Sequence, residues 1–181
     1  MVSQLKVNEI IKQSGSSITI GENGDTVSGP FTNTPAFYAE LTTDFGIGDN
    51  TSTLIQWQTT IFDTDTGYSS TTGRYTIPTG KDGKYVFFVG ALIQSGADQN
   101  MANAVIYLKK NGTTVNSNLN YYNSTRIHYK TFNTVHYETC AAGDYIEAYC
   151  LCDTQNGGGA SVLGNANAGY SHFGAHRITG A

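Results

Sequence analysis

Residues 71–92 read TTGRYTIPTGKDGKYVFFVGAL, and no other stretch of the chain indicates the architecture as clearly. Pro78, Gly80 and Gly83 mark a turn, and the aromatic and β-branched residues on either side of it predict two strands. The second strand, expected at 83–93, is apolar at nearly every position. Such a run predicts a strand that is covered on both faces, either inside a two-sheet sandwich or between subunits.

Short strand-like segments continue through the chain from Pro35 onward. Besides the strand at 83–93, we expect strands at about 36–42, 53–62, 72–78, 103–109, 113–118, 125–131, 133–140, 144–152 and 169–178. No segment has the periodicity of a helix longer than one turn. Many short strands at this spacing are typical of a β-sandwich or a jelly roll, so the predicted fold class is all-β.

Alternation along a strand assigns its side chains to faces. One face of the strand at 144–152 suits the core, because it carries Ile146, Ala148, Cys150 and Cys152. The opposite face carries Tyr149 and Leu151, and large apolar groups of this kind predict contact with a neighbouring subunit. We expect Tyr85 to belong to the same subunit interface.

The core of the domain is predicted from the apolar positions of the other strands. We expect these residues to be largely buried: Phe87, Val89, Ile106, Leu108, Ile146 and Phe173. The three cysteines are an odd number, and Cys150 and Cys152 are two positions apart on one strand, which is a poor geometry for a disulfide. All three cysteines are therefore interpreted as buried thiols.

The quoted stretch also resembles a known family. Thr72-Gly73-Arg74-Tyr75-Thr76-Ile77-Pro78, followed by Gly83-Lys84-Tyr85-Val86-Phe87, is similar to the signature of the complement C1q-type globular head. Looser likenesses are Lys110-Asn111-Gly112 after a strand, Gly143-Asp144-Tyr145-Ile146, and a closing Ser171-His172-Phe173-Gly174. The resemblance spans about residues 35–179. It implies a homotrimeric jelly roll of the C1q and tumour-necrosis-factor type, without enzymatic activity.

Residues 1–34 differ in composition from residues 35–181, which we expect to form the jelly-roll head domain. Residues 1–34 are rich in Gly, Ser and Asn beyond an apolar start, and they resemble, less specifically, the N-terminal portions of phage fibre and appendage proteins. We therefore interpret 1–34 as a short β or irregular attachment or stem segment that contacts other virion proteins. A flexible leader is the alternative.

Composition excludes several functional classes. Only 13% of the 181 residues are charged, the net charge is −4, and no basic run occurs, so nucleic-acid binding by charge is not expected. No apolar stretch reaches the roughly 20 residues that a membrane-spanning helix needs. Lys6, Glu9 and Lys12 interrupt any signal-peptide core, so we expect synthesis in a cytoplasm without export by the general route.

Metal and catalytic motifs are weak. Asp63 and Asp65 could contribute to a calcium site, since carboxylates are usual calcium ligands, but a solvated turn fits their spacing better. No Gly-x-Ser-x-Gly elbow and no phosphate-binding Gly-rich loop occurs. We expect no enzyme and no cofactor, apart from this possible calcium ion.

The longest Gly-, Asn- and Asp-rich connections are predicted at 43–52, 63–72, 94–102 and 153–168. Loops of this length in a tight β domain are often functional. The candidate residues for recognition of a host surface glycan or protein are Asp49, Tyr68, Asp98, Gln99, Asn156 and Asn165. Tyr68 is the aromatic residue among them that could stack on a sugar ring.

These observations favour a structural protein of the virion, made in the host cytoplasm. It would be the trimeric distal head of a phage fibre, knob or appendage, and it would contact the host cell surface. Two alternatives stay open. One is a secreted or surface C1q-like module of cellular origin that binds carbohydrate or protein, and the other is a β-sandwich hydrolase.

Overall fold

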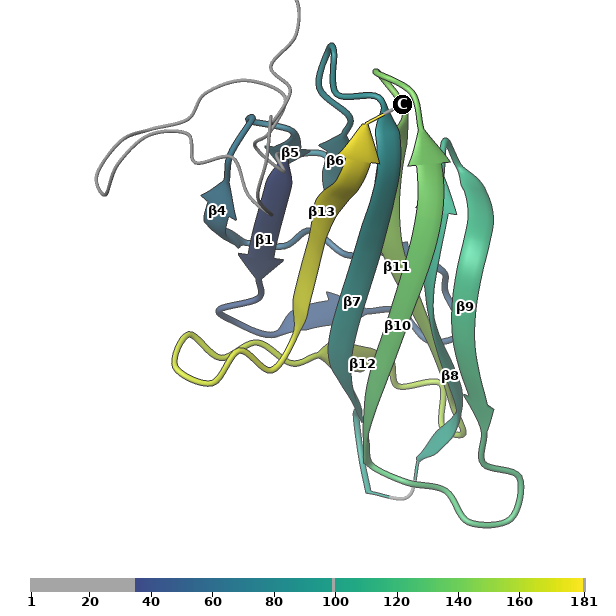
Figure 1. Ribbon diagram of the computed structural model, residues 1–181. Coiled ribbons are helices and arrows are strands. Elements are labelled where there is room, and N and C mark those ends of the chain that lie inside the picture. Colours follow the sequence, from purple (N-terminus) through teal and green to yellow (C-terminus); the bar gives the residue numbers. More distant parts are fainter. Residues whose placement is uncertain (1–34, 99, 181) are drawn as a thin grey trace, which may run out of the picture. The chain divides into compact units, whose positions relative to one another are not determined.

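The structure is a computed structural model that describes residues 35–98 and 100–180. The described residues form thirteen strands in two sheets and contain no helix (Figure 1). All strand pairs are antiparallel. The expected all-β sandwich is therefore confirmed. Because no helix exists in this part of the chain, none is long and apolar enough to span a membrane. Gln99 and residues 1–34 lie outside the described residues. The attachment role expected of residues 1–34 therefore stays a prediction.

Sheet A has seven strands. They are β1 (Ala36–Glu40), β2 (Phe45–Ile47), β4 (Thr59–Asp63), β7 (Gly83–Ser95), β10 (Tyr129–Cys140), β12 (Ala160–Val162) and β13 (His172–Gly180). β7 is central, because β10 pairs along one edge of it and β13 and β12 pair along the other. β1 and β4 extend the sheet beyond β13.

Sheet B has six strands and packs against sheet A. They are β3 (Thr53–Leu54), β5 (Tyr68–Ser69), β6 (Arg74–Thr76), β8 (Met101–Lys110), β9 (Thr113–Tyr121) and β11 (Tyr145–Thr154). β11 lies between β6 and β8, and β9 continues the sheet beyond β8.

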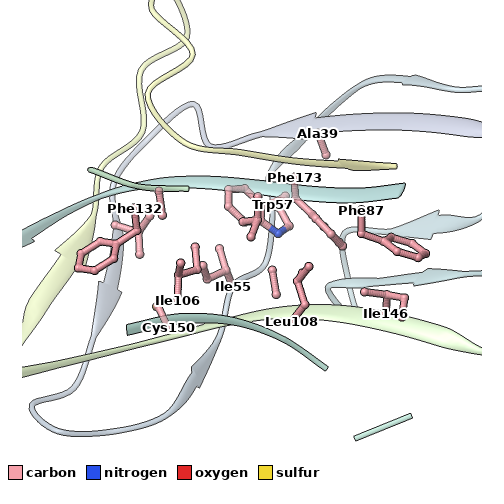
Figure 2. Close-up of a cluster of buried hydrophobic side chains, with 14 of the residues drawn as sticks. Ala39, Ile55, Trp57, Phe87, Ile106, Leu108, Phe132, Ile146, Cys150 and Phe173 are labelled. Atoms are coloured by element: carbon pink, nitrogen blue, oxygen red, sulfur yellow. The ribbon is translucent and has the colours of Figure 1, made fainter. Parts of the chain in front are cut away.

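The core fills the space between the two sheets (Figure 2). The six residues predicted to be buried are each at most 1% exposed, which confirms that expectation. Trp57, Ile55 and Phe132 also belong to the cluster that Figure 2 shows. The three cysteines are buried free thiols, and desolvation raises the pKa of each to about 12.

Two segments differ from their predicted boundaries. Residues 53–62 do not form one strand, because the chain crosses between the sheets there: Leu54 pairs with Tyr149 in sheet B, and Thr59 pairs with Glu40 in sheet A. Ile55 and Trp57 fill the core during this crossing. Conversely, the strands expected at 125–131 and 133–140 are one strand, β10, which pairs with β7 from Tyr129 to Cys140. The short strands β2, β5 and β12 lie in segments expected to be loops.

One open side of the sandwich is joined by side chains. β9 is the last strand of sheet B and β10 is the outer neighbour of β7 in sheet A. The side-chain amide of Asn116 donates to the backbone carbonyl of Val135 at 2.9 Å, and the Thr134 hydroxyl donates to Asn116 Oδ1 at 2.9 Å. These bonds occupy backbone and side-chain groups that two neighbouring edge strands would otherwise leave to solvent.

Candidate functional surfaces

Three of the four predicted loops meet at one end of the sandwich, which we call the loop end. Asp49 Oδ1 accepts hydrogen bonds from the backbone N–H of Thr154 at 2.7 Å and from its hydroxyl at 2.6 Å. Asn100 donates to Asn156 Oδ1 at 2.8 Å and accepts from the Asn156 N–H at 3.2 Å. These contacts join 43–52, 94–102 and 153–168 into one polar surface. Four of the recognition candidates belong to these loops and are described: Asp49, Asp98, Asn156 and Asn165.

The loop end has a defined electrostatic character. The hydrogen bonds from Thr154 lower the pKa of Asp49, so this carboxyl is held in its charged form. Asp98 is 89% exposed and its carboxylate lies 2.5 Å from Nδ1 of His128. Asn165, also in 153–168, accepts a bond from the backbone of Asn167 at 2.8 Å, which fixes its own loop. The end therefore offers acceptors in fixed positions.

The fourth predicted loop, 63–72, lies at the opposite end of the sandwich, beside the start of β1. The backbone N–H of Thr64 donates to Ala36 O at 3.0 Å, and β5 lies next to β1 in Figure 1. Tyr68 stacks on Phe37 with 5.4 Å between ring centroids, and its hydroxyl donates to Trp57 O at 3.0 Å. Burial raises the pKa of Tyr68. Tyr68 thus packs against the core, away from the loop end, and is not placed to stack on a sugar there.

The two calcium candidates already have donors around them. Asp63 Oδ2 accepts from the Tyr68 N–H at 2.7 Å. Asp65 pairs with Lys81 at 3.1 Å and accepts from the Thr64 hydroxyl at 2.7 Å. Within residues 35–98 and 100–180, no group of three or more His, Cys, Asp or Glu side chains is arranged to hold a metal ion. The donors around these carboxylates are an N–H group, an ammonium group and one hydroxyl, and no further carboxylate of the described residues joins them as calcium ligands would.

The three residues expected at a subunit interface lie in two different environments. Tyr85 is fully buried in the core, and its hydroxyl donates to Lys81 O at 2.5 Å. It has the same parity on β7 as Phe87, so it points inward, and its side chain is not available to a partner chain. Tyr149 and Leu151 lie half-buried on the outer face of sheet B. Their predicted orientation away from the core is therefore correct, and that of Tyr85 is not.

Several exposed or half-buried apolar side chains gather on the outer face of sheet A. One row of paired positions crosses five strands of this sheet, and we call it the aromatic row. From β4 to β10 its members are Phe62, Tyr38, Gly174, Phe88 and Val135. The Tyr38 ring is 6.1 Å from that of Phe62 and 6.2 Å from that of Phe88.

Gly174 explains how the rings of the row approach one another. A Cβ atom at this position would lie 2.4 Å from Cζ of Phe88, so the Phe88 ring rests directly over the glycine. His172 lies two residues before Gly174 on β13 and on the same face. Its ring stacks on that of Tyr38 with 5.6 Å between the ring centroids. The row ends in exposed groups, since Phe62 is 49% exposed and Val135 53% exposed. Neighbouring Tyr137 is 70% exposed.

Sequence reasoning missed the aromatic row. Its members come from five separate strands, and only the register of these strands brings them together. The signal in the sequence was that alternate positions of β7 on its outward face are also apolar: Val86, Phe88 and Leu92. That signal indicated a covered second face but did not identify its neighbours.

Two of the four histidines are engaged with acids or amides. His128 has Asp98 at Nδ1 and the Gln94 amide at 3.1 Å from Nε2. His136 Nε2 lies 3.0 Å from Glu138, which also pairs with Lys110 at 3.3 Å. A histidine that activates a nucleophile needs a hydroxyl or thiol at its second nitrogen. At His128 the Gln94 amide takes that position.

Comparisons with known proteins support the fold. No family model and no curated protein matches the sequence. The globular domain of zebrafish complement 1qA protein superimposes with a TM-score of 0.57 at 12% identity, covering 82% of this chain and 100% of that one. Murine APRIL, in a crystal structure at pH 5.0, gives 0.55 at 13% identity, with 80% and 100% covered. The described chain therefore has the C1q- and TNF-like jelly-roll fold, and similarity at this identity supports the fold alone.

Proposed function

We propose that this protein is a homotrimeric, non-enzymatic head domain that belongs to a virion appendage and contacts the host cell surface. The observation that supports it most directly is the aromatic row on the outer face of sheet A. The sequence resembles a family of trimeric jelly rolls, and the described chain has that fold. The row supplies a surface through which copies of this chain would associate.

The energetic argument for association is the exposure of the row. Soluble monomers rarely present a large contiguous apolar patch, and removing apolar surface from water stabilises a complex by about 25 cal/mol per Å². Phe62, Val135 and Tyr137 are each about half exposed or more, and they lie on one face. A ring of three copies uses two different surfaces of each chain and closes on itself, which limits the assembly to a defined size.

The arrangement of the two ends suits an appendage. The described chain enters β1 at the end of the sandwich opposite to the loop end (Figure 1). A head that is held through residues 1–34 would therefore present Asp49, Asp98 and Asn156 to the host. Three such surfaces on one head would bind together, which raises the overall affinity without any new contact.

A secreted or surface adhesion module of cellular origin is the second candidate. The observation that favours it is that similar solved structures include a zebrafish complement protein and murine APRIL. A hydrolase is the weaker candidate, because Asp98 and Gln94 occupy the ring nitrogens of His128.

The test has two parts. Light scattering on the purified full chain is expected to give three times 19.4 kDa, and a stable monomer at micromolar concentration would contradict the assembly. Quantitative mass spectrometry of purified virus particles from the source is expected to find the chain in multiples of three copies per particle. A trimer that is absent from particles would favour the cellular module.

A further inference from the structure

We propose that the outer face of sheet B binds a carboxylate-bearing polysaccharide. The inference deepens the proposed function, because it names a class of host-surface ligand for the head. It rests on that function in one respect: it requires that partner copies contact the outer face of sheet A and leave the outer face of sheet B free.

A charged row crosses the middle of this face. Arg74 on β6 pairs with Glu147 on β11, and Glu147 pairs with Lys109 on β8. Arg74 Nε donates to Glu147 Oε1 at 2.7 Å, and the Glu147 side chain is 2% exposed although it points away from the core. The carboxylate is therefore already neutralised and covered. The two cations lie about 10 Å apart across two strand spacings.

Tyrosine rings hold both cations in place. The guanidinium of Arg74 lies 4.2 Å above the centroid of the Tyr145 ring, and Lys109 Nζ lies 4.0 Å above that of Tyr149. Tyr149 in turn stacks on Tyr107 at 5.6 Å. The Ser52 hydroxyl is hydrogen-bonded to the Tyr107 hydroxyl. The face thus combines fixed cations, ring surfaces and hydroxyl groups.

Lys109 is the residue that points to an anionic ligand. In the part of the chain that the structure describes, its ammonium contacts only the faces of Tyr107 and Tyr149 and no carboxylate. A ring face attracts the charge but does not replace a carboxylate as acceptor, so the N–H donors of the half-buried Lys109 remain available to a ligand. A ligand carboxylate would accept those hydrogen bonds, while the tyrosine rings would contact the apolar faces of adjoining sugars.

A polysaccharide fits this face better than an acidic peptide. Peptides that bind to sheets usually add as a strand to an open edge. Here β6, β11 and β8 are each paired on both sides, so their backbone groups are already occupied. Only side chains face the ligand, and a chain of hydroxyl and carboxylate groups matches them.

The experiment titrates the full chain with oligogalacturonate and with the same oligosaccharide after its carboxyl groups have been reduced to alcohols. We expect binding of the acidic form that weakens as salt is added, and little binding of the reduced form. Lys109→Gln is expected to lower the affinity about tenfold, the loss typical of one hydrogen bond to a charged group. Lys109→Arg should retain binding, and Lys130→Gln on β10 of sheet A serves as the matched control.

Three results would overturn the proposal: equal binding of the reduced oligosaccharide, unchanged affinity of Lys109→Gln, or equal affinity for oligoglutamate. Melting curves and light scattering on each variant separate lost binding from lost folding. A trimer that does not bind the acidic oligosaccharide would refute this inference and leave the proposed head function standing. A monomer that does bind the acidic oligosaccharide would refute the proposed trimeric head and leave the ligand class standing.

Discussion

The side-chain amide of Asn118 donates a 2.9 Å hydrogen bond to the backbone carbonyl of Asn133, and this bond crosses from sheet B to sheet A. Asn116 makes the same contact with Val135, one strand repeat away. Asn116 and Asn118 are two positions apart on β9, so their side chains point to the same side of the strand. The sandwich is therefore joined along the β9–β10 side by asparagine side chains in place of a backbone ladder.

Removing one of these amides should weaken the domain measurably. Asn118→Ala leaves the Asn133 carbonyl without this donor, so we expect the free energy of unfolding to fall by about 1–2 kcal/mol. Urea denaturation of the two proteins measures the difference. Asn123→Ala, in the exposed β9–β10 loop, is the control and should melt like the unmodified chain.

Truncating a core side chain should lower the free energy of unfolding more than removing the Asn118 amide does. Phe173 is fully buried and lies 5.0 Å from the ring of Phe37. Phe173→Ala is expected to lower the free energy of unfolding by about 3–5 kcal/mol, through lost transfer energy and the cavity left behind. Phe62→Ala removes a half-exposed ring of the same type and should have a much smaller effect on the isolated domain. Equal effects of the two variants would contradict the assigned strand register.

A charge in the aromatic row should prevent assembly. Val135→Lys places an ammonium group on the outer face of sheet A, where partner contact would desolvate it. We expect the mass from light scattering to fall from three times 19.4 kDa to one, with an unchanged circular dichroism spectrum. Leu119→Lys adds the same charge at an exposed position on sheet B and should leave the trimer intact.

The loop end should be sensitive to acid through Asp49. Its hydrogen bonds from Thr154 lower the folded-state pKa below the unfolded value of about 3.9. The resulting stabilisation is present above the unfolded pKa and is lost as pH falls through the folded value. Asp49→Asn should therefore be less stable than the unmodified chain at pH 5, and the gap should narrow towards pH 2. A gap that is independent of pH would exclude this carboxylate as its source.

The Arg74–Glu147 pair should behave as a unit. Arg74→Met leaves a carboxylate with 2% exposure and no cation at 2.7 Å, so we expect a lower melting temperature. Adding Glu147→Gln to that variant should recover part of the loss, because the buried group is then neutral. If the double variant melts no higher than Arg74→Met, the pair is not coupled.

Much of the fold was predictable from alternation and turns. Phe87 and Phe173 could be assigned to the core because each lies in an apolar stretch with clear boundaries. Ile146 and Cys150 could be assigned to the same face by parity alone. These inferences need only one strand at a time.

The remaining features depend on pairs of strands. Tyr85 shares the parity of Phe87, but both faces of β7 are apolar, so composition did not distinguish inward from outward positions. Residues 63–72 lie at the end opposite the loop end because β4 runs antiparallel to β1. The residues of 63–72 themselves do not reveal this pairing. The asparagines of β9 likewise acquire their role only when β10 lies opposite them.

The pairing of β1 on both edges has a mechanical consequence. Its residues pair at five positions with β13 and at four with β4, and the chain enters it at Ala36. A load pulling residue 36 along the strand axis would stress these ladders in shear, so that many hydrogen bonds share the force at once. A head tethered through this strand would resist extraction far better than one tethered through a strand that unzips one bond at a time.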